Sequence, residues 1–289
     1  MKITKAVIAC GGWSTRFLPT VKTYAKQLVP ILDKPQIHYV VEELIGAGIT
    51  DIAIVQRQGE ETLQKHFTPD QELNEYLEKT GKTESLAGLN NILSKVKFTF
   101  LPQTPNFPYG NGTPILVAKD FIGQDSFFYL WGDDMTIEDT PGKFLLRMVN
   151  VWQQTQAKAV ISTFQVPWEE VDRYGTMRYK KDSTVPNQIE DIPEKLPRDQ
   201  APSNFINAAR FIVPASIIPI LENLEIDRGE LWFVNAVSVL AKSDIVVTAN
   251  YADVKAQWST TGDPQNWLKT NLKLAKNNPK FASILDSIK

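Results

Sequence analysis

Glycine and positive charge gather just after the first apolar segment of the chain. The segment KAVIAC is followed by Gly11 and Gly12, and then by Arg16, Lys22 and Lys26. Glycine after a strand lets the backbone turn sharply and bring its N–H groups close to a bound anion. Arg16 offers a planar fork for two phosphate oxygens, whereas lysine acts as a point charge. Three cations so close to a glycine turn favour a polyphosphate ligand over a purely structural loop.

The loop matches neither of the two common phosphate-binding motifs. G-x-x-x-x-G-K-[ST] is absent, and G-x-G-x-x-G requires glycines where Ser14 and Phe17 stand. A nucleotide-cofactor oxidoreductase also needs an acidic residue about 20 positions beyond the loop. Asp33 is near that distance, but it lies in a D-K-P turn rather than after a second strand. An oxidoreductase is therefore a weak alternative.

A second candidate for chemistry is the carboxylate that ends the apolar segment SFFYLWG. Asp133 follows this segment directly, and a buried carboxylate is costly unless it binds a cation or is hydrogen-bonded. Mg²⁺ suits this position, because it is a hard ion held by one or two carboxylates and phosphate oxygens. We expect the neighbouring Asp134 to point to the other face. The only histidines, His38 and His66, fall in predicted helices and are interpreted as structural.

Composition narrows the class of protein. The chain has 289 residues, enough for one large domain, and 31 basic against 33 acidic side chains. The net charge of -2 gives no general attraction to nucleic acid or to an anionic membrane. The single cysteine, Cys10, excludes an intramolecular disulfide and indicates a reducing cytoplasm. No apolar stretch reaches about 20 residues and no signal peptide is recognisable, so we expect a cytoplasmic protein without a membrane span.

The elements that must position these residues follow from the hydrophobic pattern. Strands are predicted at 5–10, 51–55, 97–102, 126–134, 159–166 and 244–250. Helices are predicted at 36–48, 60–67, 112–121, 143–154, 214–224, 229–242 and 264–277. This alternation predicts an α/β fold, with a Rossmann-like, mostly parallel sheet covered by helices and a C-terminal helical extension. Ligands of such sheets lie at the carboxyl ends of the strands, where Gly11, Gly12, Gln103 and Asp133 are expected to meet.

Two segments depart from this alternation. Residues 70–91 are charged and predict a solvated surface helix. After about residue 165 the pattern loosens: RYGTMRYKKD predicts one arm of a hairpin, and the loop DIPEKLPRDQAPSN follows. No repeat, linker or domain boundary is recognisable, so residues 1–289 are interpreted as a single domain.

The glycine-rich run resembles the signature of a known enzyme family. GGWSTRFLPTVKTYAKQLVP is similar to G-x-G-T-R-x-x-P-x-T-x-x-x-P-K-x-x-x-P of the sugar-1-phosphate nucleotidylyltransferases. Further similarities follow in the family's order over nearly the whole chain: DKPQIHYVVEELIGAGITDI, LWGDD, RYG, PEKLP, APSNFINAARF and RGELWFVNAV. Residues 70–91 resemble an insertion of the uridylyltransferase branch. The chain is therefore identified as a divergent member, closest to the bacterial UTP–glucose-1-phosphate uridylyltransferases.

The resemblance implies a reaction and a nucleotide-diphospho-sugar transferase fold. A phosphate oxygen of glucose 1-phosphate would attack the α-phosphorus of UTP, giving UDP-glucose and pyrophosphate with Mg²⁺ as cofactor. Gly11 and Gly12 would carry the nucleotide on their backbone, Arg16 would meet the β- and γ-phosphates, and Lys26 would meet the phosphates at the reacting centre. Asp133 would hold the metal. Lys22 is a weaker candidate that can equally be solvated.

The same resemblance assigns the base and the sugar. Gln103 would read the uracil edge, and Gly110 would let the base approach the chain. Gly175 would allow close approach of the hexose, while Glu194 would bind a sugar hydroxyl and Lys195 the sugar phosphate. Residues 1–165 would form the nucleotide-binding half and residues 166–289 the sugar-binding half. Relatives are commonly dimers or tetramers, so a homo-oligomer is a further expectation.

Four positions depart from the family pattern. Ser14 replaces a glycine, which costs about 1 kcal/mol if the position needs a positive φ. Thr260 stands where the family has a second metal-binding aspartate, and Asp263 is a conceivable substitute. Ala209 replaces the glycine of G-R-Y, and Asn235 replaces the aspartate of L-T-D-A. The departures leave two alternatives open: a weakened or inactive nucleotide-binding homologue, and an enzyme for another sugar 1-phosphate or for dTTP.

Overall fold

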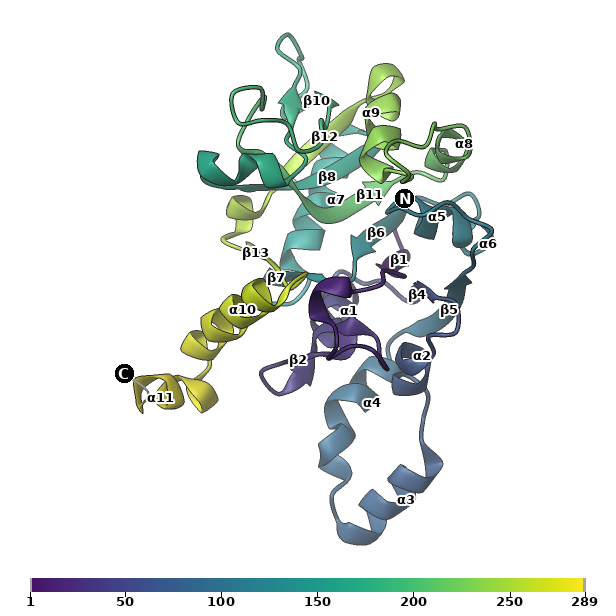
Figure 1. The fold of residues 1–289 in the computed structure, drawn as a ribbon, viewed down its shortest axis with the longest axis vertical. Coiled ribbons are helices and arrows are strands. Elements are labelled where there is room, and N and C mark those ends of the chain that lie inside the picture. The colour runs from purple at the N-terminus through teal and green to yellow at the C-terminus, as the bar shows by residue number, and fades with distance from the viewer. Residues whose placement is uncertain (1, 288–289) are drawn as a thin grey trace.

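A seven-stranded sheet forms the centre of the molecule. The computed structural model describes residues 2–287, and the sheet has the strand order β12-β8-β11-β6-β1-β4-β5 (Figure 1). Its strands are β1 (Lys5–Cys10), β4 (Asp51–Arg57), β5 (Lys97–Gln103), β6 (Phe127–Trp131), β8 (Ala159–Gln165), β11 (Phe205–Val213) and β12 (Val246–Asn250). β1 pairs in parallel with β4 and β6, β4 with β5, and β8 with β12, whereas β11 is antiparallel to β6 and β8.

Helices cover both faces of this sheet, so its apolar strands are buried on both sides. One core lies beneath α1 (Gln36–Gly46), α2 (Thr62–His66) and α7 (Lys143–Thr155). The other lies beneath α5 (Thr113–Val117), α6 (Lys119–Ile122), α8 (Ile217–Glu222) and α9 (Phe233–Ser243). The predicted α/β class with a mixed, mostly parallel sheet is confirmed. The helix predicted over 112–121 is two short helices that meet at Ala118.

Strand β11 is the main element that the sequence prediction missed. The C-terminal part was expected to hold helices around one strand, yet FINAARFIV forms a nine-residue strand at the centre of the sheet. The pairing of β11 with β8 shifts register between Asn207 and Phe211, and Ala209 within this bulge has φ 64°. A strand that is buried on both faces and interrupted by a bulge lacks the alternation that identifies strands.

Three small ribbons lie outside the main sheet. β7 (Asp134–Ile137) pairs with β13 (Gln257–Thr260), β9 (Arg178–Tyr179) with β10 (Ile189–Asp191), and β2 (Pro30–Ile31) with β3 (Lys34–Pro35), all antiparallel. The hairpin predicted around RYGTMRYKKD is confirmed by the β9–β10 pair. The β7–β13 ribbon brings the C-terminal part of the chain to the end of β6, where Asp133 lies.

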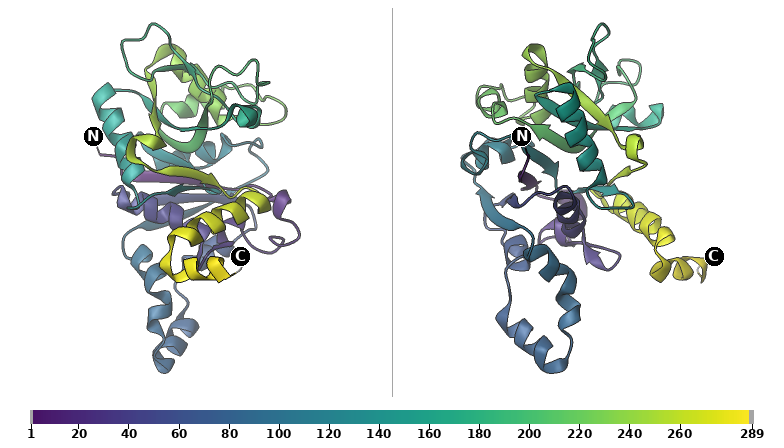
Figure 2. Two further views of the ribbon diagram at one scale, coloured as in Figure 1. Left: turned by 90° about the vertical axis from the view of Figure 1, so that its left-hand side faces the viewer. Right: turned by 180° about the vertical axis from the view of Figure 1, so that it is seen from behind.

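Two helical arms project from the body (Figures 1 and 2). One consists of α3 (Gln71–Thr80), the single-turn helix η3 (Thr83–Leu86) and α4 (Ala87–Leu93), and the other of α10 (Pro264–Asn277) and α11 (Pro279–Ser287). Within α3 only Leu77 is buried, which confirms the prediction of a solvated helical segment. Within residues 2–287, no helix combines the length and apolarity that crossing a bilayer requires.

Candidate active site

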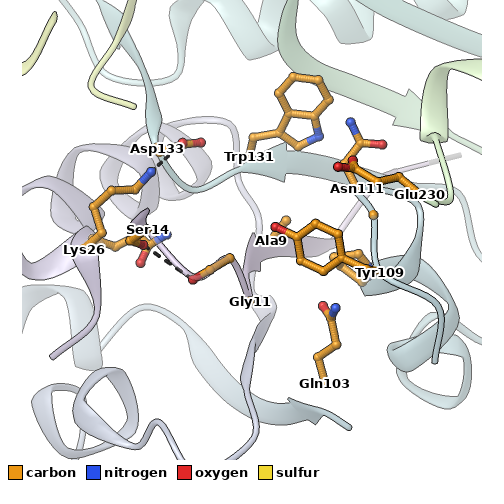
Figure 3. A pocket seen from close by; sticks show the side chains of 14 residues that line it. Ala9, Gly11, Ser14, Lys26, Gln103, Tyr109, Asn111, Trp131, Asp133 and Glu230 are labelled. Atoms are coloured by element: carbon orange, nitrogen blue, oxygen red, sulfur yellow. Dashed lines mark hydrogen bonds and ion pairs between the residues drawn. The ribbon is translucent and has the colours of Figure 1, made fainter. Parts of the chain in front are cut away.

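A cavity of about 250 Å³ opens at the carboxyl ends of β1, β5 and β6 (Figure 3). Six of the predicted site residues line it: Gly11, Gly12, Lys26, Gln103, Gly110 and Asp133. Parallel strands end at the same edge of a sheet, which is why residues from three distant segments meet here. The lining also includes Tyr109, Asn111, Trp131 and Glu230, which the sequence analysis did not single out.

The glycines of the lining make room for close contacts between chain segments. A Cβ at Gly11 would lie 2.6 Å from Oε1 of Gln103, whereas a Cβ at Gly12 would meet nothing within 4 Å. Gly110 has φ 139° and packs against the backbone of Leu231, so only glycine fits there without strain. Gly11 thus keeps the Gln103 amide at the cavity wall, and Gly12 leaves its backbone open to a ligand.

Ser14 adopts the left-handed conformation that the family glycine predicts. Its φ is 54° and its ψ is 34°, and it begins the single-turn helix η1 (Thr15–Phe17). The serine therefore adopts the positive φ that a glycine at this position would allow. Left-handed backbone costs a non-glycine residue about 1 kcal/mol.

Lys26 and Asp133 form an ion pair across the mouth of the cavity (Figure 3). Lys26 begins the single-turn helix η2 (Lys26–Leu28) and is buried, and its Nζ donates to Oδ2 of Asp133 at 2.7 Å. Burial would raise the pKa of Asp133, but the charges of Lys26 and Arg16 prevail and lower it below its usual value. The site therefore presents an ionised carboxylate paired with a nearly buried ammonium group.

Asp134 points away from this cavity, as predicted. Its buried carboxylate accepts a hydrogen bond of 2.9 Å from Nε1 of Trp258 on β13. Burial and the nearby charge of Asp133 raise the pKa of Asp134 to about 7. Asp134 therefore anchors the β7–β13 ribbon and does not line the cavity.

A buried ion pair holds the turn that carries Asp133. The guanidinium of Arg210 donates to Glu43 of α1 at 2.9 to 3.2 Å, and the side chains are 0% and 3% exposed. The same guanidinium donates to the carbonyl oxygens of Trp131 at 3.4 Å and of Asp134 at 2.9 Å. Because these two carbonyls flank Asp133, Arg210 fixes the backbone on both sides of it. We call this arrangement the Arg210 clamp.

Residues for a metal are sparse around Asp133. Within residues 2–287, no group of three or more His, Cys, Asp or Glu side chains is arranged to hold an ion. Thr260 lies opposite Asp134 in the β7–β13 ribbon, and Asp263 caps α10 by accepting from Asn266 N at 2.9 Å. A Mg²⁺ ion held by one carboxylate and by phosphate oxygens still fits Asp133, because Mg²⁺ usually keeps several non-protein ligands.

The predicted sugar residues form a separate group. Gly175 and Glu194 face each other in an isolated antiparallel bridge, and burial raises the pKa of Glu194. Lys195 has φ 53°, and its Nζ lies 5.5 Å from the ring centre of Trp232. These three residues do not line the first cavity, but Trp232 follows within two positions of the lining residue Glu230. Their predicted roles stay predictions.

Arg16 also lies outside the first cavity. It lines a second cavity, together with Thr260 and Asp263. Lys22 is exposed and lines neither cavity, in agreement with the solvated alternative. Asp33, on which an oxidoreductase would depend, forms an exposed ion pair of 2.7 Å with Lys280 in the β2–β3 turn.

Three of the unpredicted lining residues stand in recognisable motifs, although the sequence analysis assigned them no role. Asn111 stands within the G-N-G run, and its Oδ1 accepts from the backbone N–H of Phe233 at 2.7 Å, which joins α9 to the cavity wall. Glu230 belongs to the motif RGELW. Trp131 belongs to the motif LWGDD, and in the structure its indole N–H is buried without a hydrogen-bond partner among the described residues.

The similarity of the chain to known proteins extends over nearly its full length. The model of the nucleotidyl transferase family matches residues 5–277. A UTP–glucose-1-phosphate uridylyltransferase of Bacillus subtilis is 32% identical over 97% of this chain and 94% of its own. UTP–glucose-1-phosphate uridylyltransferase 1 of Staphylococcus saprophyticus is 33% identical over 95% of this chain and 93% of its own.

Solved structures lead to the same family. A UTP-bound UGPase from Acinetobacter baumannii superposes with a TM-score of 0.86 and 30% identity, covering 99% of this chain and 98% of its own. A UDP-glucose pyrophosphorylase complexed with UDP-glucose superposes with a TM-score of 0.83 and 28% identity, covering 96% and 100%. The chain therefore belongs to the nucleotidyl transferase family, among the UTP–glucose-1-phosphate uridylyltransferases.

Proposed function

We propose that the protein forms UDP-glucose and pyrophosphate from UTP and glucose 1-phosphate. The observation that carries this proposal is the cavity at the strand ends, in which Gly11, Gly12, Lys26, Gln103 and Asp133 gather. It combines open backbone and a cation for phosphates with an amide that can both donate and accept. The activity named for the relatives agrees with this chemistry.

The reaction needs positioning and charge stabilisation more than a protein nucleophile. A phosphate oxygen of glucose 1-phosphate bonds to the α-phosphorus of UTP, and the bond from that phosphorus to the bridging α–β oxygen breaks. The attacking oxygen is already ionised, so no base has to remove a proton. Lys26 is placed to offset negative charge at the reacting phosphorus, and its burial strengthens that effect.

The nucleotide is bound in this proposal along the edge of β1 and β5. Gly12 offers its backbone to the phosphates, and Gln103 contacts the uracil edge through its amide. Gly110 gives the base access to the chain. At the opposite end, Gly175, Glu194 and Lys195 receive the sugar and its phosphate.

Magnesium is the implied cofactor. Asp133 would hold it together with phosphate oxygens of UTP, and the ion would supply Lewis-acid stabilisation of the triphosphate. In the structure, Nζ of Lys26 donates a hydrogen bond to Oδ2 of Asp133. With Mg²⁺ bound to that carboxylate, the ammonium group of Lys26 would contact the phosphates of UTP instead. The Arg210 clamp keeps the carboxylate in place during this exchange of partners.

The test is release of pyrophosphate from UTP, glucose 1-phosphate and Mg²⁺. We expect UDP-glucose as the product, with slower turnover when dTTP or another sugar 1-phosphate is supplied. If no combination of nucleoside triphosphate and sugar 1-phosphate reacts, the proposal fails. Calorimetry with UTP would then test the alternative of an inactive nucleotide-binding homologue, which Thr260 in place of a second carboxylate favours.

Residues 1–289 act as one domain in this proposal, with a nucleotide-binding half up to about residue 165 and a sugar-binding half beyond it. The partners are small anionic substrates, with neither nucleic acid nor membrane involved, in the cytoplasm. A homo-oligomer is part of the proposal, and size-exclusion chromatography with light scattering tests it.

A further inference from the structure

The backbone next to Lys26 is held by a side chain from a distant segment. Ala25 directly precedes Lys26 and is buried, and its N–H donates to Oγ1 of Thr62 at 2.9 Å. Within residues 2–287 this is the only hydrogen bond of that N–H. A buried backbone donor without a partner is unfavourable. The backbone position of Lys26 therefore depends on the hydroxyl group of Thr62.

A carboxylate fixes the direction of this hydroxyl group. Oε1 of Glu60 accepts from the backbone N–H of Thr62 at 2.7 Å and also from its hydroxyl group. A hydroxyl group has one hydrogen to donate and lone pairs with which to accept. Because the hydrogen of Thr62 goes to Glu60, a lone pair is left to accept from Ala25. Glu60, Thr62 and Ala25 thus form a directional chain of hydrogen bonds, which we call the Glu60 relay.

The Glu60 relay carries a feature that is unfavourable for stability. Oε2 of Glu60 is buried and has no hydrogen-bond partner among the described residues, which is costly for a carboxylate oxygen. Burial, and then the charges of Asp133 and Glu60, raise the pKa of the Cys10 thiol at the end of β1, and the charge of Lys26 lowers it. Both carboxylates therefore lie near that strand end and the glycine-rich loop. Such a local cost is typical of residues that serve a function.

The helix that supplies the relay is anchored along its length. Thr62 begins α2, and Leu63 in this helix and Phe67 directly after it are both buried in the core beneath α1. His66 ends α2, and its Nε2 lies 2.8 Å from Nε2 of His38 on α1. These contacts keep α2 from following a displaced loop. Thr62 is therefore a fixed support for the segment that it holds.

A second support holds the other end of η2. The backbone N–H of Gln36, the first residue of α1, donates to the carbonyl oxygen of Val29 at 3.2 Å, and its Nε2 donates to that of Gly132 at 3.0 Å. Gly132 directly precedes Asp133, so α1 joins η2 to the turn that carries the predicted metal ligand. With the Glu60 relay before Lys26 and α1 after it, η2 is fixed on both sides.

We infer that Thr62 and Glu60 are positioning residues that hold Lys26 in place for the reaction. This inference rests on the proposed function. A cation stabilises the charge of a transition state most when it is held in position before the reaction begins. Neither Thr62 nor Glu60 lines the first cavity, so their effect passes through the backbone of Ala25.

The test is a double-mutant cycle between Thr62 and Lys26. Thr62→Val keeps the size of the side chain and removes the hydroxyl group, and it should lower kcat/KM for UTP about tenfold. In a Lys26→Met background the same change should have less than about a twofold effect, because the group that Thr62 positions is gone. Thr62→Ser, which restores the hydroxyl group, should return kcat/KM to within about twofold of the wild type. Equal losses in both backgrounds, or an unaltered kcat/KM in Thr62→Val, overturn the inference.

Two further variants control for folding. Glu60→Gln leaves Thr62 in place and weakens only the acceptor of its hydroxyl group, so kcat/KM for UTP should fall about threefold. If Thr62→Val does not fold, this variant decides, and an unaltered kcat/KM overturns the inference. Thr68→Val removes a hydroxyl group that donates to the carbonyl oxygen of Gln64 at 2.8 Å, just past the end of α2. It should leave kcat/KM unchanged, and a loss equal to that of Thr62→Val overturns the inference.

A binding measurement separates this inference from the proposed function if turnover is absent. Calorimetric titration of the full chain with UTP and Mg²⁺, without glucose 1-phosphate, measures binding without the reaction. Thr68→Val should bind UTP like the wild type, whereas Thr62→Val should bind it about fivefold more weakly, and only when Lys26 is present. This pattern in an inactive chain supports the relay and rejects the enzyme. Equal UTP affinity of the inactive wild type and Thr62→Val overturns the relay as well.

Discussion

The two halves of the molecule build their parts of the site in different ways. In the first half, β1, β4, β5 and β6 run parallel, and their carboxyl ends collect the predicted nucleotide residues in one cavity. In the second half, the predicted sugar residues Gly175, Glu194 and Lys195 lie in the loops that flank the β9–β10 hairpin, and none of them lines that cavity. Residues that follow parallel strands can be predicted from the sequence to lie together, because such strands end at one edge of the sheet, whereas the positions of loop residues cannot.

The departures from the family pattern are distributed in the same way. The first half has only Ser14, whose backbone keeps the expected left-handed conformation. The second half has Ala209, Asn235 and Thr260, and one of these changes the charge beside Asp133. Three of the four departures thus lie in the second half, and the Arg210 clamp connects the halves, because Glu43 belongs to the first and Arg210 to the second.

Breaking the clamp should have the largest effect. Replacing Arg210 by Met leaves the buried Glu43 carboxylate without its cationic partner, with only the Thr136 hydroxyl still donating to it, which should lower the free energy of unfolding by about 3–5 kcal/mol. Glu43→Leu combined with Arg210→Met should recover part of that loss. Urea unfolding measures both variants. Arg178→Met, which removes an ion pair whose partners are both 41% exposed, should cost under about 1 kcal/mol, and a similar cost for both single variants would contradict the clamp.

Removing the buried cation tests the nucleotide side alone. Lys26→Met should lower kcat/KM for UTP by about 10²–10³-fold, since a preorganised charge in a water-poor site is lost. Lys22→Met should change it less than about twofold, because Lys22 is exposed and lines neither cavity. Steady-state kinetics at saturating glucose 1-phosphate measures kcat/KM for UTP in both variants. Equal losses in the two variants would mean that general positive charge, and not the position of Lys26, assists the reaction.

Restoring a carboxylate tests the acceptor side. Thr260→Asp should lower the Mg²⁺ concentration for half-maximal rate by about tenfold, because a second carboxylate joins Asp133. Thr260→Asn, which is equally large but uncharged, is the control and should leave that concentration unchanged. The measurement is the rate of pyrophosphate release across a magnesium titration. An unchanged midpoint in Thr260→Asp would mean that Asp133 and the substrate already satisfy the ion.

The left-handed residues give one smaller test in each half. Ser14→Gly and Ala209→Gly should each raise the free energy of unfolding by up to about 1 kcal/mol, because glycine adopts positive φ without a steric penalty. Ala208→Gly is the control: it lies in the same strand without a positive φ and should destabilise. Chemical denaturation compares the three. Destabilisation by Ala209→Gly would show that the methyl group packs more favourably than the backbone is strained.

The smallest effect concerns the histidine pair of the first half. Nε2 of His38 lies 2.8 Å from Nε2 of His66, and burial, the charge of His66 and that of Lys34 lower the pKa of His38 to about 4. The unfolded chain binds protons near pH 6.5, so stability from the neutral pair is present above that pH and falls as the pH drops toward 4. Melting temperatures between pH 7 and pH 4 should decline less steeply in a His38→Gln, His66→Gln variant. An identical slope would assign the acid sensitivity to other groups.

Much of this architecture could be predicted from the sequence, for identifiable reasons. The strand of KAVIAC and the helix at 264–277 appear where their patterns place them, because apolar runs and helical periodicity are local properties. The fold class followed from the order of those elements. Strand β11 did not, because its pairing partners β6 and β8 are distant in sequence and its bulge removes any regular pattern.

The sequence by itself determined the family, the α/β class and the set of residues at the ends of β1, β5 and β6. Only the tertiary structure decided that Arg210 donates hydrogen bonds to the backbone on both sides of Asp133, and that Arg16, Arg173 and Lys269 line one cavity. The physical reason is range. Propensity and periodicity act over a few neighbouring residues, whereas a buried ion pair or a cavity depends on side chains that meet only after the sheet has assembled.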